Sequence, residues 1–166
     1  MIEQLFNLQT LEWPEAVLRV FLACLFGFFL GFDRSSKNKP IDFRVYMIVA
    51  MTACMVALMG AELCAYYRDL YTNESEIMQF DLLRVVEGVL VGIGFLGAGA
   101  IIHSDNENRV YGTATGASIW SAGTIGLLIG FGFYGLSTLA FIVLAIILVV
   151  FGYLRKPLFN EDDKYE

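Results

Sequence analysis

Five runs of about twenty mostly apolar residues follow one another along this 166-residue chain, and charged residues gather between the runs. A helix of about 20 residues rises about 30 Å, which matches the hydrocarbon thickness of a bilayer. Because lipid offers no hydrogen-bond partners to the backbone, apolar runs of this length are predicted to be transmembrane helices. The predicted spans cover residues 14–32, 46–63, 82–102, 113–131 and 136–154.

The composition supports the same fold class, an all-α polytopic transmembrane bundle. Hydrophobic residues make up 57% of the chain and charged residues 17%, whereas a soluble domain carries about 25% charge. Residues 1–13 are expected to form an interfacial segment, 14–154 the transmembrane domain, and 155–166 a short acidic cytoplasmic tail.

The distribution of basic residues predicts the orientation. Eight Lys and Arg residues follow the first, third and fifth spans; three lie in the N-terminal segment or follow the second and fourth spans. Positive loops stay in the cytoplasm. The N-terminus is therefore predicted to be outside and the C-terminus inside.

Several classes of function find no support in the sequence. The net charge of −6 argues against a nucleic-acid partner. The three cysteines form no Cys-x-x-Cys pair, which argues against a zinc site and a disulfide framework. There is no nucleophile–base pair, phosphate-binding loop or catalytic metal signature, so we expect neither an enzyme nor a cofactor.

Small residues recur at every fourth position on four of the five spans. Positions four apart share a helix face, and small side chains there let helix backbones approach closely in lipid. Tight packing is the favoured interpretation, and a pore lining is the alternative. The fifth span lacks such a stripe and is expected to be peripheral. The predicted helix-packing residues are Ala23, Gly27, Gly31, Gly88, Gly92, Gly94, Gly97, Gly99, Ser118, Ala122, Gly126 and Gly130.

Polar residues at membrane depth are costly, so those near the span ends are the candidate functional groups. Asp81, Arg84 and Glu87 follow at i, i+3 spacing at the predicted outer end of the third span. Asp81 can cap the helix and Arg84 can pair with either carboxylate. This outer charge cluster is either a self-neutralised helix entrance or an ion or partner site. Arg19, near the start of the first span, is expected to reach the headgroups.

A second cluster is predicted on the cytoplasmic side, where three junctions between loop and helix carry polar residues. Arginines there are usually headgroup anchors, and Thr113 is a candidate helix cap. Anion or protein recognition is the alternative. His103 is the single histidine and is expected at the interface, so the sequence defines no metal site. The members of the cytoplasmic cluster are Asp33, Arg34, Arg44, Thr113 and Thr115.

A family resemblance rests on the run GIGFLGAGAI at 92–101, followed by Val-Tyr-Gly at 110–112 and Ala-Ser-Ile-Trp at 117–120. These residues resemble the signature of the MgtC/SapB membrane protein family. Asp81 and Arg84 stand at the family's usual distance before the run, and Gly-Phe-Asp-Arg at 31–34 resembles its Gly-x-Glu-Arg element. The resemblance covers about residues 17–130. Residues 155–166 leave no room for the soluble C-terminal domain of longer members.

The resemblance implies a multi-pass protein of the bacterial inner membrane, associated with adaptation to low magnesium and with virulence. Some members are thought to bind and restrain the membrane-embedded ATP synthase. The leading hypothesis is therefore a non-enzymatic regulatory or accessory protein that contacts a membrane partner, the ATP synthase by resemblance, or a second copy of itself as a homodimer. The alternative is a divalent-cation carrier or channel for magnesium.

Overall fold

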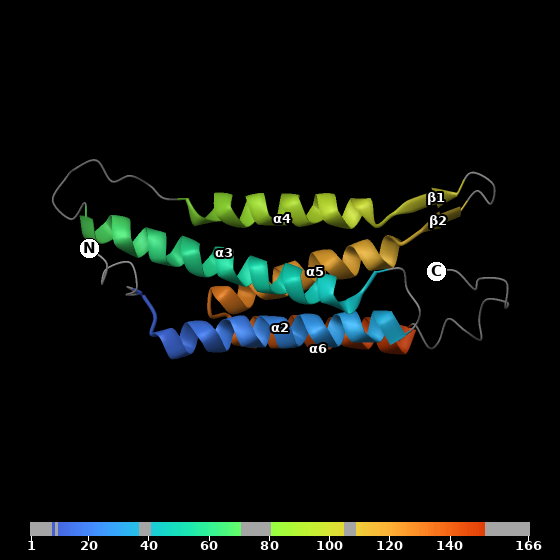
Figure 1. Cartoon of the computed structure of the whole chain (residues 1–166), viewed down its shortest axis with the longest axis horizontal. Coiled ribbons are helices and arrows are strands. Elements are labelled where there is room, and N and C mark those ends of the chain that lie inside the picture. The colour runs from blue at the N-terminus through green and yellow to red at the C-terminus, as the bar shows by residue number, and fades with distance from the viewer. Residues whose placement is uncertain (1–7, 9, 37–40, 71–80, 105–108, 152–166) are drawn as a thin grey trace.

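A computed structural model describes residues 8, 10–36, 41–70, 81–104 and 109–151, and it is almost entirely helical. Successive helices run in opposite directions, side by side (Figure 1). The predicted helical class is confirmed, and each predicted span contains a helix. The helices are α2 (Trp13–Ser36), α3 (Phe43–Leu70), α4 (Leu82–Gly99), α5 (Thr113–Gly130) and α6 (Tyr134–Ile146), which continues as a π-helical turn at Ile147–Phe151.

Three of the described helices are long and apolar enough to cross a membrane: Trp13–Phe32, Phe43–Arg68 and Leu82–Gly99. A shorter apolar helix covers Tyr134–Val150. Helix α5 has 18 residues, but its many glycine, serine and threonine residues lower its hydropathy. The number of helices that cross the bilayer, and their orientation, stay predictions.

A β-hairpin replaces the end of the third predicted span. Helix α4 ends at Gly99, and strands β1 (Ile102–Ser104) and β2 (Arg109–Tyr111) pair antiparallel, with Ile102 opposite Tyr111. The prediction that helix continues through residue 102 is wrong. The backbone of Gly112 has φ 83° and lies against the Ala100 carbonyl, which leaves no room for a Cβ and closes the hairpin onto the end of α4.

Helix α3 packs between α2 and α5, with glycines of both neighbours against its backbone. A Cβ on Gly27 of α2 would lie 2.7 Å from the Tyr46 carbonyl oxygen, and one on Gly130 of α5 would lie 2.6 Å from the Cys54 carbonyl oxygen. Gly31 and Gly126 lie equally close to the α3 backbone. The predicted packing role of these four glycines is confirmed. Ala23, Ser118 and Ala122 are buried as well.

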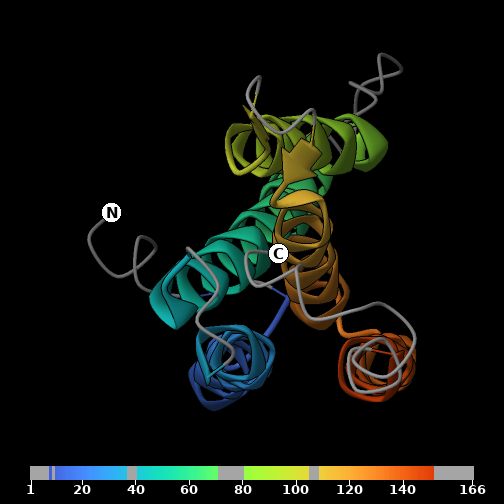
Figure 2. The same cartoon turned by 90° about the vertical axis from the view of Figure 1, so that its right-hand side faces the viewer.

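Helix α4 covers one edge of this core and packs along a narrow strip (Figure 2). Gly97 of α4 and Gly116 of α5 lie against each other, and Ile93 fills the space beside Gly123. A Cβ on Gly88, Gly92, Gly94 or Gly99 would meet nothing within 4 Å. Helix packing was predicted at these four positions, and no described helix of this chain packs against them, so a packing partner there would have to be another molecule.

Helix α6 lies at the opposite edge of the bundle, as expected for the span without a small-residue stripe (Figure 2). Ser137 is its buried residue. The ring of Phe141 stacks on that of Phe26 of α2, with 4.5 Å between the centroids. Leu144 is half-buried, and Leu136, Leu139, Ile142, Val143 and Ile146 are exposed, which confirms the prediction of a peripheral helix.

Replacing glycine by alanine is expected to destabilise the protein where the glycine contacts a neighbouring backbone, and not to destabilise it where the space beside the glycine is open. Gly126→Ala places a methyl group against the Ala50 backbone and should lower stability by about 1–3 kcal/mol. Gly94→Ala fills open space and should be neutral, or stabilising by up to about 1 kcal/mol, because alanine is the better helix former. Thermal unfolding of the purified variants in detergent measures both. Equal melting temperatures would contradict this packing.

Candidate functional site

The most deeply buried charge in the described part of the chain is Arg19, on the second turn of α2. The residue is 9% exposed. Its guanidinium donates hydrogen bonds to the Gly130 carbonyl oxygen at 2.7 Å, to the Tyr134 hydroxyl at 2.9 Å and to Glu15 Oε1 at 2.5 Å. One side chain of α2 therefore joins the end of α5 to the start of α6.

Among the described residues, the backbone hydrogen bonds that end α5 do not use the Gly130 carbonyl, which Arg19 binds. After α5 ends, the Phe133 amide donates to the Leu128 carbonyl and the Gly132 amide to the Ile129 carbonyl. This is a Schellman ending, with Gly132 in the left-handed region at φ 82°. The Gly130 carbonyl is left free of these backbone bonds, and the arginine fork supplies its donor. The positive charge also lies at the negative end of the helix dipole.

The expectation that Arg19 reaches the headgroups is wrong, because these acceptors hold its side chain inside the bundle. The i, i+4 spacing of Glu15 and Arg19 was visible in the sequence and indicates an ion pair. Gly130 and Tyr134 lie more than 110 positions away, so no local pattern could find them. Sequence reasoning therefore missed this site.

The outer charge cluster lies at the start of α4, at the same end of the bundle as the Arg19 site. Asp81 accepts a hydrogen bond from the Leu83 amide at 3.0 Å, which confirms the predicted cap. Arg84 Nε lies 3.8 Å from Asp81 Oδ2. Glu87 is exposed one turn further on, and no ion pair between the described residues joins it to Arg84.

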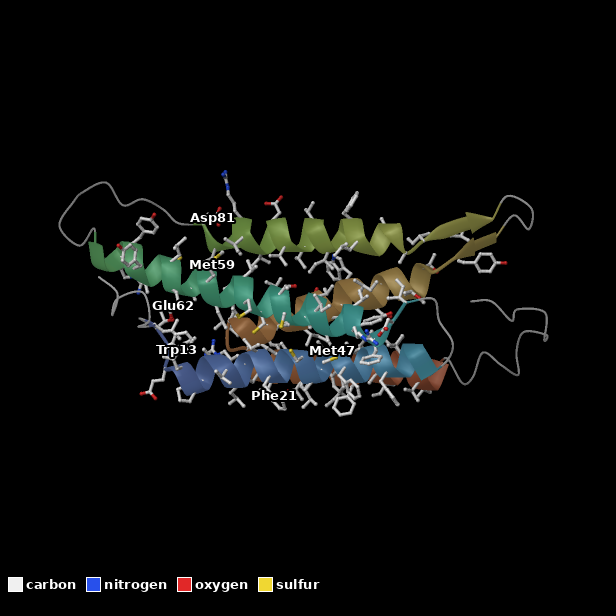
Figure 3. All side chains as sticks on the ribbon, viewed as in Figure 1. Trp13, Phe21, Met47, Met59, Glu62 and Asp81 are labelled. Atoms are coloured by element: carbon white, nitrogen blue, oxygen red, sulfur yellow. The ribbon has the colours of Figure 1, made fainter. Side chains whose placement is uncertain are left out.

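The charged side chains of this cluster do not enter the bundle. In Figure 3 the sticks on the upper edge of α4 point away from every other described helix, and Asp81 lies at the end that projects over α3. Glu62 of α3 lies at the same end but on the side of α3 toward Trp13, where it accepts a hydrogen bond from the Thr10 hydroxyl. The described residues contain no group of three or more His, Cys, Asp or Glu side chains that could hold a metal ion.

The predicted cytoplasmic cluster is placed only in part. Arg44 Nε lies 3.4 Å from Asp42 Oδ2, and Asp42 accepts the Arg44 amide at 2.9 Å, so Asp42 caps α3. Thr113 does not cap α5: Gly112 holds the cap position with no side-chain bond. Thr115 is buried. The side chains of Asp33, Arg34 and His103 lie outside the described residues.

A shallow apolar groove of about 530 Å³ separates the start of α3 from the end of α4. Asp42 and Val45 line one wall, and Phe95 and Gly99 the other, with Ile119 of α5 among the lining residues. Asp42, next to Arg44, lines the groove, whereas Arg44, Thr113 and Thr115 themselves are not among its lining residues.

The comparisons with known proteins fit this architecture. The model of the MgtC family matches residues 20–156. The chain belongs to the MgtC family. The match includes the glycine run of α4, the hairpin and all of α5.

Curated relatives of this MgtC-family chain are similar over most of its length. Protein SapB of Bacillus subtilis (strain 168) is 30% identical over 141 residues, which cover 82% of this chain and 58% of SapB. Protein MgtC of Brucella abortus (strain 2308) is 33% identical over 115 residues, covering 66% of this chain and 42% of MgtC. A protein of Escherichia coli (strain K12) named "Putative magnesium transporter YhiD" is 28% identical over 148 residues, covering 89% and 66%.

The chain thus spans about half the length of the first curated relatives that it matches, 58% and 46%. No solved structure matches it significantly. The matches show a membrane protein of the MgtC family, and the roles of its individual residues follow from the geometry above.

Removing the guanidinium of this MgtC-family protein should loosen one end of the bundle. We expect Arg19→Leu to lower the free energy of unfolding by about 1–3 kcal/mol, because the Gly130 carbonyl loses its donor. Tyr134→Phe removes a single hydrogen bond and should cost about 0.5–1.5 kcal/mol.

The matched control is Arg44→Leu, since Arg44 also pairs with a carboxylate but is 74% exposed. Exposed pairs contribute about 0–1 kcal/mol. Thermal unfolding in detergent compares the three variants. An Arg19→Leu protein as stable as Arg44→Leu would show that the buried network does not hold the helices together.

Proposed function

We propose that this chain is a non-enzymatic accessory protein of the bacterial cytoplasmic membrane. It acts in adaptation to magnesium supply by contacting another membrane protein through its helices. Relatives named for MgtC and for magnesium transport support the link to magnesium. By family resemblance the membrane-embedded ATP synthase is the partner to test first.

The observation that carries this proposal is the uncovered surface of α4. We call it the α4 outer face. Val91 and Phe95 on this face are 67% and 80% exposed, and a Cβ on Gly88 or Gly92 would meet nothing within 4 Å. Large and small apolar residues at these spacings suit a second helix packed closely in lipid. The α4 outer face consists of Arg84, Glu87, Gly88, Val91, Gly92 and Phe95.

The interior of the bundle supports contact at the surface over passage through the middle. Helices α3 and α5 touch backbone to backbone at Gly126, and α4 and α5 do so at Gly97 and Gly116. Arg19 is held by partners at one end of the bundle, and Asp81, Arg84 and Glu87 lie on the outside of α4. Charged groups therefore gather at the bundle end and on an outward face.

Blocking the α4 outer face should remove the partner while leaving the fold intact. Gly92→Leu adds a bulky side chain in open space, so the protein should fold and then fail to admit a partner helix. The matched control is Gly135→Leu, because Gly135 of α6 is equally open. Tagged protein is purified from native membranes, and co-purifying membrane proteins are identified by mass spectrometry.

We expect a membrane protein, the ATP synthase first, to co-purify with wild type and with Gly135→Leu and to fall at least tenfold with Gly92→Leu. Retention of the same partner by Gly92→Leu would exclude the α4 outer face as its binding site. Absence of any membrane protein in all three samples would contradict the accessory function.

A divalent-cation carrier is the alternative function, favoured by the carboxylates of Asp81 and Glu87. Magnesium prefers hard oxygen ligands and usually keeps several waters, so exposed carboxylates suit it. The relative named as a magnesium transporter favours the same possibility.

Magnesium flux into liposomes that contain the purified protein separates the two functions. The accessory function predicts no saturable flux in wild type and no difference in Glu87→Gln. A saturable flux that disappears in Glu87→Gln, with an unchanged melting curve, would establish the carrier instead.

A further inference from the structure

We propose that the α4 outer face pairs two copies of this chain in parallel, about a two-fold axis along the membrane normal. The inference rests on the proposed function in that both use the same face. A second copy covers the face when no other partner helix is bound.

Helix α4 exposes Gly88 and Gly92, although glycine destabilises a helix. Glycine in a helix is about 0.5–1 kcal/mol less favourable than alanine. Inside the bundle that cost is offset by close backbone contact, as at Gly97 against Gly116. At Gly88 and Gly92 no contact within the described chain offsets it. A helix from outside can do so.

The charge pattern of the α4 outer face favours a second copy of this chain as its partner. Arg84 and Glu87 both lie on the exposed side of α4, and three residues correspond to about 4.5 Å along the helix axis. Arg84 Nε has Asp81 at 3.8 Å on its own chain. The guanidinium carries five N–H donors, enough to bind a second carboxylate.

Glu87 of a second copy can supply that carboxylate. All copies of a membrane protein insert in one orientation, so α4 of a partner copy runs parallel across a two-fold axis, and equal depths meet. The two Arg84 residues then lie at one depth, and Glu87 of the other copy lies about 4.5 Å further along the helix axis, within reach of the long arginine side chain. Two opposite charges on one face are self-complementary in this arrangement, and Val91 and Phe95 pack against the glycines below them.

Cysteine cross-linking tests the contact with all charges in place. Val91→Cys lies on the α4 outer face, and Leu139→Cys on α6, 59% exposed, is the control. Wild type, with Cys24, Cys54 and Cys64, is the blank. Oxidation of native membranes with copper–phenanthroline should give a disulfide-linked dimer of Val91→Cys, with a yield about tenfold above Leu139→Cys and wild type. Equal yields in the three proteins would overturn the proposal.

Reversing the two charges separately tests the complementarity. Arg84→Glu places two carboxylates opposite each other in its own homodimer, and Glu87→Arg places two guanidinium groups opposite each other. A mixed dimer of the two variants restores both pairs. Co-expressed with different tags, each variant should co-purify with itself about tenfold less than wild type does, and with the other variant at close to the wild-type level.

The outcomes separate this inference from the proposed function. Self-association of both variants at the wild-type level, or failure of the mixed pair to associate while both melt normally, would overturn the dimer. A monomeric protein that still captures a membrane partner would leave the proposed function standing without the dimer. A dimer that captures no partner would leave the dimer standing and remove the proposed function.

Discussion

The arrangement of the bundle depends on backbone contact between α3 and its two neighbours. In lipid, apolar side chains gain little by leaving their surroundings, so helices associate through close packing and hydrogen bonds. Gly27 and Gly31 of α2 lie against one side of α3, and Gly126 and Gly130 of α5 lie against another. Helix α5 also carries Gly116 against α4. The contact between α3 and α5 forms the surfaces against which α2 and α4 pack.

Such close contact leaves the helix ends as the places where polar groups need partners. The Schellman ending of α5 satisfies two carbonyls, and Arg19 binds the Gly130 carbonyl. The same guanidinium binds Tyr134 and Glu15. Within the helices, Ser118, Ser121 and Thr124 donate to carbonyls four residues earlier, so α5 can be rich in hydroxyls without exposing unbonded donors.

Helix α4 differs from α2 and α5 in that most of its glycines contact no neighbouring helix, and this difference bears on function. It resembles α5 in glycine content, yet a Cβ on its glycines at 88, 92, 94 and 99 would meet nothing within 4 Å, while Gly97 alone lies against a neighbouring backbone. Its charges stand on the same exposed side, beside Val91 and Phe95. One strip of α4 therefore belongs to the fold, and the opposite strip carries the residues that the proposed contacts require.

The sequence by itself determined the helical class, the approximate extent of five apolar segments, the cap at Asp81 and the peripheral place of α6. These follow from local run length, spacing and composition. The sequence also indicated that the small residues are sites of helix packing. It did not show which of them contact another helix of the same chain. Gly92 and Gly126 lie in similar sequence patterns, because spacing of four residues places small residues on one helix face but does not predict which helix packs against that face.

Only the tertiary structure decided that Gly126 touches α3 while Gly92 faces outward, that Arg19 binds the end of α5, and that a hairpin ends the third segment. Each of these depends on groups that come together from distant parts of the chain. The physical reason is that a helix has a fixed set of faces, whereas the choice of buried face is made by the packing of all the helices at once.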